Sequence, residues 1–211
     1  MKKSFYLVRH GQTNWNRDGI IQGAVNEDSV LTELGISQAH ALGKHFSKIV
    51  DKVTLICSDL QRSIQTTTIL QQYLPNARVI MSPSLRERSL GLMQGLKQKE
   101  LGFEWSNDYY YRENELYKWE TLAKVKERMK FLELNLQALR GDIILVGHNW
   151  QQSYLLNILT KQHTNFVGLK NCSYHKLDYY MDEFIAEQDK VKVKEVEELE
   201  IVNEEVTSKT A

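Results

Sequence analysis

The sequence predicts an α/β protein, built as a three-layer α/β/α sandwich around a mostly parallel central sheet. Two observations predict this class. Short apolar runs of strand length recur along the chain, and between them lie longer segments whose apolar residues repeat every three or four positions. Strands that alternate with helices in this way pair in parallel, with helices covering both faces of the sheet.

Five apolar runs are the expected strands of this sheet, at residues 5–8, 53–57, 78–81, 143–147 and 173–179. Near the end of the chain, Val191-Lys192-Val193-Lys194 alternates apolar and charged side chains, which is typical of a strand at a sheet edge. Residues 190–211 are otherwise rich in glutamate. We therefore expect a charged C-terminal tail that could begin with this edge strand.

Four segments are the expected helices, at about residues 32–50, from residue 58 to just before Pro75, at about 121–139 and at about 151–159. Ser58-Asp59-Leu60-Gln61 has the pattern of a capping box that opens the second helix. Gly141 is expected to end the third helix. Two helices carry one apolar stripe each: Ile36, Ala39, Leu42, Phe46 and Ile49 in the first, and Leu122, Val125, Met129, Leu132, Leu136 and Leu139 in the third.

Residues 96–120 interrupt the alternation, because they are polar and rich in Trp and Tyr. No linker rich in Pro, Gly or Ser separates them from the rest of the chain. We therefore expect an insert over the active-site edge of the sheet rather than a second domain. The expected organisation is one catalytic domain at residues 1–189, with the insert at about 96–120, and a tail at 190–211; a chain of 211 residues is long enough for one such core.

The charge of the chain is unevenly distributed. Residues 1–181 carry 23 Lys and Arg against 17 Asp and Glu, a net +6, while residues 182–211 carry 4 against 10, a net −6. A mildly basic body suits a small anionic substrate. No basic stripe is interleaved with aromatic residues, so a nucleic-acid partner is not expected.

The remaining composition points to an ordinary globular protein, with 42% apolar and 26% charged residues. Cys57 and Cys172 are expected to be reduced thiols, and neither stands in a zinc-binding spacing. The apolar run at residues 5–8 is too short for a signal peptide or a membrane span. We expect a cytoplasmic protein, monomeric or homodimeric, with no membrane partner.

Charged residues follow four of the expected strands. Arg9-His10-Gly11-Gln12 follows the first, Arg62 lies in the first turn of the helix after the second, Glu87 comes after the third, and His148 after the fourth. Ligands of open α/β sheets bind at the carboxyl ends of the strands. Helix N-termini and arginine side chains both favour anions. The sequence therefore predicts a phosphate site at this edge, with an imidazole that can attack phosphorus.

The segment Leu7-Val8-Arg9-His10-Gly11-Gln12-Thr13-Asn14-Trp15-Asn16 resembles the signature of the histidine phosphatase superfamily, in the branch that holds cofactor-dependent phosphoglycerate mutases and related phosphatases. The resemblance covers roughly residues 4–180. It continues through Gln22-Gly23, Leu31-Thr32-Glu33-Leu34-Gly35, Ser58-Asp59-Leu60-Gln61-Arg62-Ser63-Ile64-Gln65-Thr66, Leu85-Arg86-Glu87 with Gly91 and Gly95, and Val146-Gly147-His148.

The resemblance implies a role for each residue of the catalytic core. His10 would be the nucleophile that forms a phosphohistidine, which divides one displacement into two easier ones. Arg9, Arg62 and His148 would hold the phosphoryl oxygens. Glu87 would be the general acid for the leaving alcohol and then the base for the incoming water.

The resemblance also implies further contacts to the substrate. Asn16 and the backbone near Asn149 would add hydrogen-bond donors to the phosphate. The candidates for contacts with the rest of the substrate are Gln22, Gly23, Tyr109, Arg112 and Trp150, although the Tyr-rich stretch could equally pack the insert. No metal and no cofactor is implied, because the arginines would neutralise the phosphate.

Two departures from the family pattern affect the pocket. Gly147-His148-Asn149-Trp150 replaces the frequent Ser-His-Gly-Gly, and the larger side chains at the last two positions could narrow the pocket. Asp59 replaces a frequent proline and brings a negative charge near the anion site, unless it caps the helix. Neither departure removes a residue of the catalytic core.

Three functions remain open at this point: a phosphatase of small phosphorylated metabolites, a phosphoglycerate mutase, and a non-catalytic protein that binds a phosphorylated ligand. Family mutases resemble Glu-Arg-His-Tyr-Gly after the acid, whereas this chain has Glu87-Arg88-Ser89-Leu90-Gly91. They also carry an arginine pair in the insert, where this chain has only Arg112. Both differences favour the phosphatase, and the presence of His10 and Glu87 argues against the non-catalytic protein.

Overall fold

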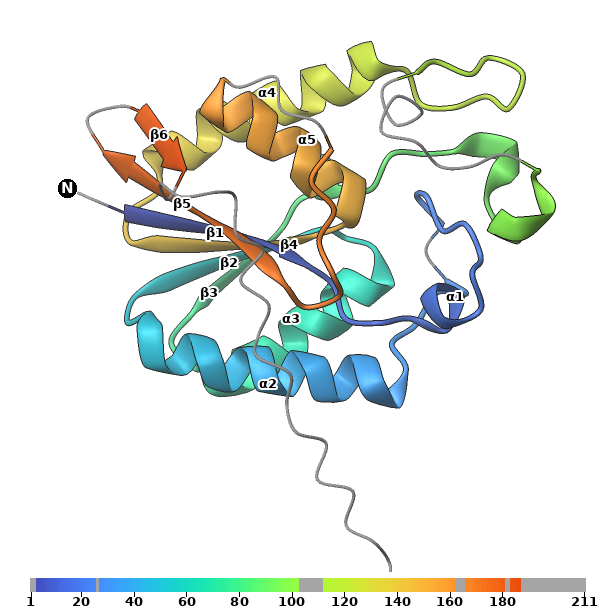
Figure 1. The fold of residues 1–211 in the computed structure, drawn as a ribbon. Coiled ribbons are helices and arrows are strands. Elements are labelled where there is room, and N and C mark those ends of the chain that lie inside the picture. Colours follow the sequence, from blue (N-terminus) through green and yellow to red (C-terminus); the bar gives the residue numbers. More distant parts are fainter. Residues whose placement is uncertain (1–2, 26, 103–111, 162–165, 181–182, 187–211) are drawn as a thin grey trace, which may run out of the picture.

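The computed structural model describes residues 3–25, 27–102, 112–161, 166–180 and 183–186, which form a three-layer sandwich (Figure 1). The middle layer is a six-stranded sheet with the order β3-β2-β4-β1-β5-β6. Its parallel strands are β1 (Lys3–Arg9), β2 (Val53–Cys57), β3 (Arg78–Met81) and β4 (Asp142–Gly147). β5 (Tyr174–Tyr180) runs antiparallel to β1, and β6 (Glu183–Ala186) runs antiparallel to β5. The predicted fold class is confirmed.

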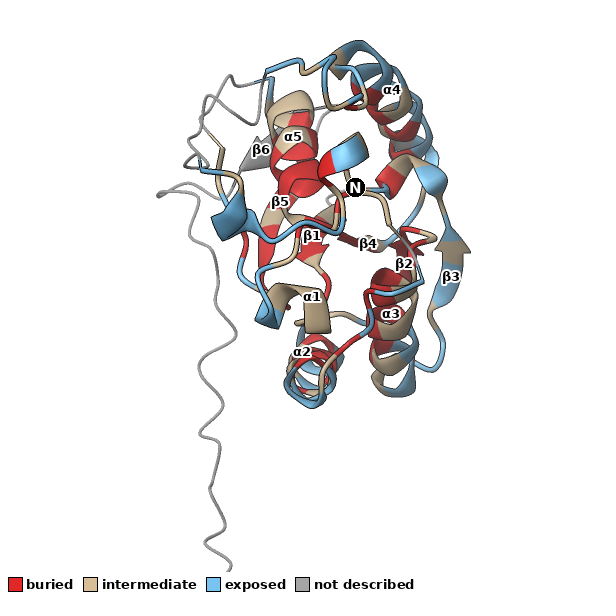
Figure 2. Cartoon of the chain, turned by 90° about the vertical axis from the view of Figure 1, so that its right-hand side faces the viewer, coloured by how far each residue is buried: buried red, intermediate tan, exposed pale blue. Residues whose placement is uncertain are grey.

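Two pairs of helices cover the two faces of the sheet. α2 (Glu33–Ile49) and α3 (Gln61–Tyr73) lie on one face, and α4 (Leu122–Ala138) and α5 (Asn149–Thr160) lie on the other (Figure 1). Because successive side chains of a strand point to opposite faces, β1 contributes to both cores. Phe5 and Leu7 pack with α4 and α5, while Tyr6 and Val8 pack with α2 and α3. Figure 2 shows buried residues on the sheet and on the helix faces that contact it.

Short helical turns lie outside these layers, in the loops that follow the strands. They are α1 (Asn14–Arg17) and the 3₁₀ turns η1 (Pro83–Leu85), η2 (Gly91–Met93) and η3 (Gln98–Glu100). The sequence did not predict them, because a single turn carries no apolar repeat. The last of these turns lies in the segment expected to be an insert, whose residues 103–111 are outside the described part of the chain.

Three expectations about helix ends and faces are wrong. The N-cap of α3 is Leu60, and the Ser58 hydroxyl accepts only from the amide of Leu60, at 3.3 Å, so there is no capping box. α4 ends at Ala138, and Gly141 (φ +76°) instead forms the turn before β4. On α2, Ile36 and Ile49 are exposed at 41% and 44%, because the helix buries Gly35, Ala39, Ala41, Leu42, Gly43 and Phe46.

Other expectations agree with the structure. Cys57 and Cys172 are buried, and neither forms a disulfide. The apolar stripe of α4 packs into the core as expected. No helix within the described ranges is both long and apolar enough to cross a membrane. The possible edge strand at Val191–Lys194 and the acidic tail lie outside the described residues and stay predictions.

The start of α2 lies in close contact with the loop after β1. A Cβ on Gly35 would lie 2.0 Å from the carbonyl oxygen of Gln12, and a Cβ on Gly11 would lie 2.5 Å from the carbonyl oxygen of Gly35. The Thr32 amide also donates to the Gln12 carbonyl, at 2.9 Å. These contacts fix the backbone that follows Arg9 and His10 against a helix end.

We predict that Gly35→Ala destabilises the protein by more than about 1 kcal/mol, although Ala in place of Gly normally stabilises a helix interior. The reason is that two backbone segments must separate to admit the methyl group. Thermal unfolding measures the effect, and Ser37→Ala on the exposed side of α2 is the control. An equal or higher melting temperature for Gly35→Ala would contradict the prediction.

Candidate active site

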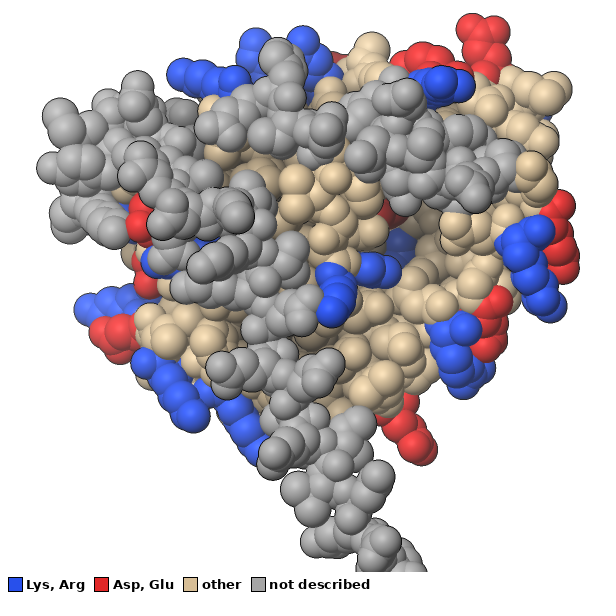
Figure 3. Space-filling view, in the orientation of Figure 1, with Lys and Arg blue, Asp and Glu red and all other residues tan. Residues whose placement is uncertain are grey.

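A pocket opens at the carboxyl ends of the parallel strands, where the loops after β1, β3 and β4 meet. Figure 3 shows a hollow on this face with basic and acidic atoms inside it. The residues that line the pocket are Arg9, His10, Ile21, Gln22, Gly23, Arg62, Glu87, Arg88, Leu90, Gln98, Trp119, Asn149 and Trp150. Four of the five predicted catalytic residues therefore line one pocket, and the fifth, His148, is buried in contact with two of them, His10 and Arg62.

His10 is buried, and its ring is held in one orientation. Its Nδ1 lies 2.7 Å from the carbonyl oxygen of Gly11. A carbonyl can only accept, so Nδ1 carries the hydrogen and Nε2 keeps its lone pair. Burial, and then the positive charges of Arg62 and Arg9, lower the pKa of His10 well below its usual value of 6.5. The ring is therefore neutral at physiological pH, as a nucleophile must be.

Arg62 connects His148 to the loop after α1. Its Nε donates to Nδ1 of His148 at 3.2 Å, while Nη1 and Nη2 donate to the carbonyl oxygens of Val25 and Gly23, both at 2.7 Å. Burial lowers the pKa of Arg62 to about 10, so the guanidinium stays charged at neutral pH. Nδ1 of His148 accepts this bond, and the hydrogen of the neutral ring is therefore on Nε2. The two imidazole rings lie 5.3 Å apart.

The segment between α5 and β5 orients three of the predicted phosphate-binding residues. Arg9 Nη1 donates to the carbonyl oxygen of Leu169 at 2.6 Å, and the Leu169 amide donates to Oδ1 of Asn149 at 2.6 Å. Asn171 Nδ2 donates to Oδ1 of Asn16 at 3.2 Å. The Thr13 amide donates to the same oxygen. This oxygen belongs to the capping box of α1, and Asn16 is not among the residues that line the pocket, so its contact with a phosphate stays a prediction.

Glu87 receives its hydrogen bonds from backbone amides. Oε1 accepts from the amides of Arg88 and Gln151, both at 3.0 Å, and Oε2 accepts from the amide of Trp150 at 3.2 Å. Burial raises the pKa of Glu87, while these amides and the positive charge of Arg62 act in the opposite direction. The net result is a carboxyl that holds its proton more strongly than a solvated glutamate, as a general acid requires.

The backbone near Asn149 was expected to donate to the phosphate. The amides of Trp150 and Gln151 donate to Glu87, and a contact from the amide of Asn149 itself stays a prediction. The side chain of Asn149 lines the pocket while it accepts from Leu169. Asp59 does not cap α3, because it forms an ion pair with Arg86 at 2.5 Å.

The predicted substrate contacts divide into two groups. Gln22, Gly23 and Trp150 line the pocket. Arg112 is exposed and is not among the lining residues, so the structure does not bring it to the site. Tyr109 lies outside the described residues.

Arg88, Trp119 and Trp150 form one side of the pocket, which we call the outer wall. The sequence analysis did not predict the parts that Arg88 and Trp119 play in it. Arg88 lies between two indole rings, with its guanidinium carbon 5.2 Å from the Trp119 ring centre and 5.4 Å from that of Trp150. Its Nε donates to the Glu120 carbonyl at 2.8 Å, and its Nη2 lies 3.6 Å from Oε2 of Glu113. The position of Arg88 directly after Glu87 was the available signal, since neighbours of a catalytic acid enter the same loop.

The comparisons with known proteins show the family. The model of the histidine phosphatase superfamily (branch 1) matches residues 5–190. The chain therefore belongs to this superfamily. Within it, a "Probable phosphoglycerate mutase GpmB" of Cronobacter sakazakii is 31% identical in an alignment of 191 positions that covers 86% of this chain and 87% of that protein.

Other relatives have phosphatase names. A "Metal-independent phosphoserine phosphatase" of Arabidopsis thaliana is 40% identical over 94 residues, which are 44% of this chain and 39% of that protein. Among solved structures, "Mycobacterial hydrolase 1" aligns with a TM-score of 0.76 at 24% identity, over 89% of this chain and 97% of that one. A mycobacterial glucosyl-3-phosphoglycerate phosphatase aligns with a TM-score of 0.71 at 24% identity, over 87% and 93%. At these identities the structural likeness shows the shared fold.

The pKa directions of His10 and Glu87 predict a bell-shaped pH profile. On the acid limb, kcat/KM falls as His10 gains a proton, below pH 6.5 because its pKa is lowered. On the alkaline limb, kcat/KM falls as Glu87 loses its proton, above its usual 4.5 because its pKa is raised. We expect Glu87→Gln to remove the alkaline limb and to leave the acid limb in place.

The measurement is kcat/KM between about pH 4 and about pH 8 for phenyl phosphate, whose basic phenolate needs a proton in order to leave. The substrate titrates in the same way for both enzymes, so the difference between them reports on Glu87. An alkaline limb that persists in Glu87→Gln would show that another group donates the proton.

Proposed function

We propose that this protein is a phosphomonoesterase of small phosphorylated metabolites, that it works through a phosphohistidine on His10, and that it needs no metal. The observation that carries the proposal is the orientation of His10, whose Nδ1 hydrogen is held by its neighbour's carbonyl so that Nε2 is free to attack. The guanidinium groups of Arg9 and Arg62 and the Glu87 carboxyl, whose pKa is raised, line the same pocket. The family supports phosphoryl transfer as the chemistry.

In the first step, Nε2 of His10 forms a bond to phosphorus while the bond from phosphorus to the ester oxygen breaks. Glu87 gives its proton to that oxygen, and the alcohol leaves. Arg9 and Arg62 hold the phosphoryl oxygens, with His148 Nε2 as a further donor. In the second step, the Glu87 carboxylate takes a proton from water, the water oxygen attacks phosphorus, and the bond to His10 breaks to release inorganic phosphate.

The outer wall favours phosphatase over mutase chemistry. A mutase must hold a bisphosphate, which needs cations for the second phosphate and the carboxylate. Beyond Arg9 and Arg62, Arg88 is the cation among the described lining residues, and its charge is compensated by Glu113. Residues 103–111 contain neither Lys nor Arg. The mutase remains the second candidate because of the named relatives that cover most of the chain.

The proposal also keeps the broader expectations from the sequence. Residues 1–189 would form one catalytic domain with an insert at about 96–120, followed by a charged tail at 190–211. The protein would be cytoplasmic, monomeric or homodimeric, without nucleic-acid or membrane partners. The support for the lack of a nucleic-acid partner is the modest basic excess of the body, which forms no basic stripe interleaved with aromatic residues.

We predict that the purified protein hydrolyses p-nitrophenyl phosphate in the presence of EDTA and that His10→Ala lowers the rate by at least about 1,000-fold. Rapid quench with a ³²P-labelled substrate should trap label that is stable in base and lost in acid, as phosphohistidine is. His40→Ala is the control, since His40 lies on α2 and bonds to Tyr73. Full activity of His10→Ala, or a strict need for added metal, would contradict the proposal.

We predict that 3-phosphoglycerate, with 2,3-bisphosphoglycerate present, is either hydrolysed or left unchanged, but not isomerised. A phosphorus NMR time course distinguishes free phosphate from 2-phosphoglycerate in one sample. Phosphoserine and glycerol 3-phosphate in the same panel compare a leaving group that carries a carboxylate with one that does not. Fast isomerisation with little free phosphate would establish the mutase instead.

A further inference from the structure

The loop that carries Glu87 contacts an ion pair between Arg128 and Glu120, neither of which belongs to the loop. We call residues 84–92 the acid loop and residues 117–120 the strap. We propose that Arg128 and Glu120 are positioning residues that hold the acid loop so that Glu87 can reach the leaving oxygen. This rests on the proposed function, because it takes Glu87 as the general acid.

Arg128 lies on α4 and donates to the backbone on both sides of the acid. Its Nη1 donates to the carbonyl oxygens of Ser84 and Arg86, each at 2.7 Å, and Nη2 reaches that of Glu87 at 3.5 Å. A guanidinium has donors fixed in one plane, so three carbonyls that converge on it cannot shift independently. Arg128 thus determines the backbone position from which the acid side chain extends.

Glu120 completes this arrangement from the strap. Its two oxygens accept from Nε and Nη2 of Arg128, at 2.9 and 3.0 Å, and Oε2 also accepts from the Ser89 amide at 3.3 Å. Both side chains of the ion pair are largely buried, with 17% and 19% exposed. A bidentate pair in this setting has a defined geometry, unlike an exposed pair.

Backbone bonds and a close approach continue the contact between strap and loop. The Glu120 amide donates to the Ser89 carbonyl at 2.8 Å, and the Leu92 amide donates to the Tyr117 carbonyl at 2.9 Å. Gly91 has φ +50°, and a Cβ there would lie 2.0 Å from the carbonyl oxygen of Tyr117. The strap therefore lies directly on the acid loop, and the ion pair joins both to α4.

The arrangement separates two tasks. The amides at the start of α5 orient the carboxyl group of Glu87, as described above. Arg128 and Glu120 orient the backbone of the same residue, and neither of them lines the pocket. Proton transfer requires the carboxyl to lie within hydrogen-bond distance of the leaving oxygen, so loss of the ion pair should weaken acid catalysis selectively.

The test uses two substrates that differ in their need for an acid. p-Nitrophenolate leaves without a proton, whereas the more basic phenolate needs one. For Arg128→Met we expect kcat/KM for phenyl phosphate to fall about 10- to 100-fold, and that for p-nitrophenyl phosphate to fall less than about 3-fold. Because kcat/KM reports the first phosphoryl transfer and not the hydrolysis of phosphohistidine, the ratio isolates the acid step.

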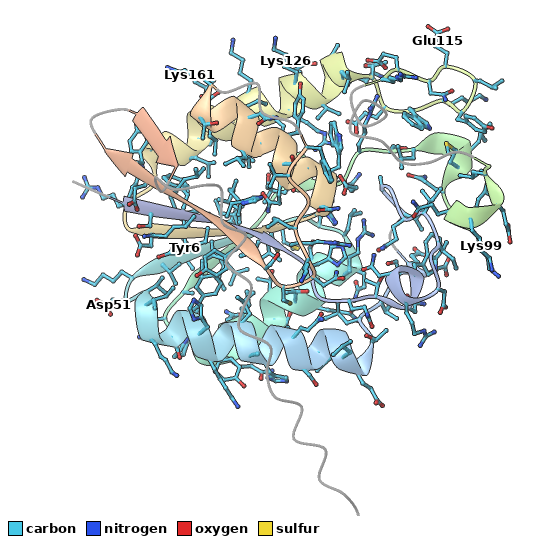
Figure 4. All side chains as sticks on the ribbon, viewed as in Figure 1. Tyr6, Asp51, Lys99, Glu115, Lys126 and Lys161 are labelled. Atoms are coloured by element: carbon cyan, nitrogen blue, oxygen red, sulfur yellow. The ribbon has the colours of Figure 1, made fainter. Side chains whose placement is uncertain are left out.

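Two further variants test whether a loss of activity comes from the donor geometry of Arg128, from its charge or from a failure to fold. Arg128→Lys keeps the charge but loses the planar donors. We expect kcat/KM to fall again for phenyl phosphate more than for p-nitrophenyl phosphate, but by a smaller factor than in Arg128→Met. Glu120→Gln breaks the ion pair with almost no change in volume. We expect it, like Arg128→Lys, to lose more activity with phenyl phosphate than with p-nitrophenyl phosphate. Lys126→Met is the matched control: Lys126 is exposed on the same helix and points away from the sheet (Figure 4), so both substrates should react at wild-type rates.

The double variant Glu87→Gln/Arg128→Met shows whether Arg128 acts through Glu87, and it should be no slower with phenyl phosphate than Glu87→Gln alone. An equal loss for both substrates in Arg128→Met, or wild-type ratios in both Arg128→Lys and Glu120→Gln, would overturn the positioning role while leaving the phosphatase proposal intact. If instead Glu87 is not the general acid, the Glu87→Gln variant itself would lose the same factor in kcat/KM with both substrates.

Discussion

The site depends on the parallel pairing of β1 with β4. Arg9 lies opposite Gly147 in this register, and the His10 amide donates to the Gly147 carbonyl at 3.0 Å. Parallel strands end at the same edge of a sheet, so the residues that follow them must meet. His10 and His148 are adjacent for this reason, although they are 138 positions apart in the chain. A slip by one residue would turn one of the two strands over and separate the rings.

Burying two guanidinium groups beside two imidazoles is costly unless each donor is satisfied. Carboxylates do this in most buried sites, but here backbone carbonyls do most of it: those of Gly23 and Val25 for Arg62, and that of Leu169 for Arg9. A carbonyl carries no net charge, so the pocket stays cationic after its donors are partly satisfied. That residual charge is available for a phosphate dianion, and it also keeps His10 neutral by lowering its pKa.

The catalytic candidates could be predicted because each follows directly after a strand or opens a helix, and such positions are visible in a single sequence. The residues that hold them could not. Arg128 contacts carbonyls more than 40 positions earlier, and Leu169 contacts Arg9 across 160 positions. Backbone carbonyls occur at every residue, so no side-chain pattern marks the ones used. The false capping box at Ser58 has a related cause, since its hydroxyl bonds within the loop and the helix begins three residues later.

The start of α5 is the clearest case in which the structure changes the interpretation of a motif. A helix N-terminus favours an anion, and the family resemblance implied that the backbone near Asn149 donates to the substrate phosphate. In the structure, the amides of Trp150 and Gln151 donate hydrogen bonds to the carboxyl group of Glu87. Burial favours the protonated acid, and the helix end favours the carboxylate that remains after the proton has left. The two effects act on the pKa of Glu87 in opposite directions, with burial the larger. A residue that donates a proton in one half-reaction and accepts one in the next must exist in both forms, and the amides at this helix start stabilise the carboxylate form that acts as the base.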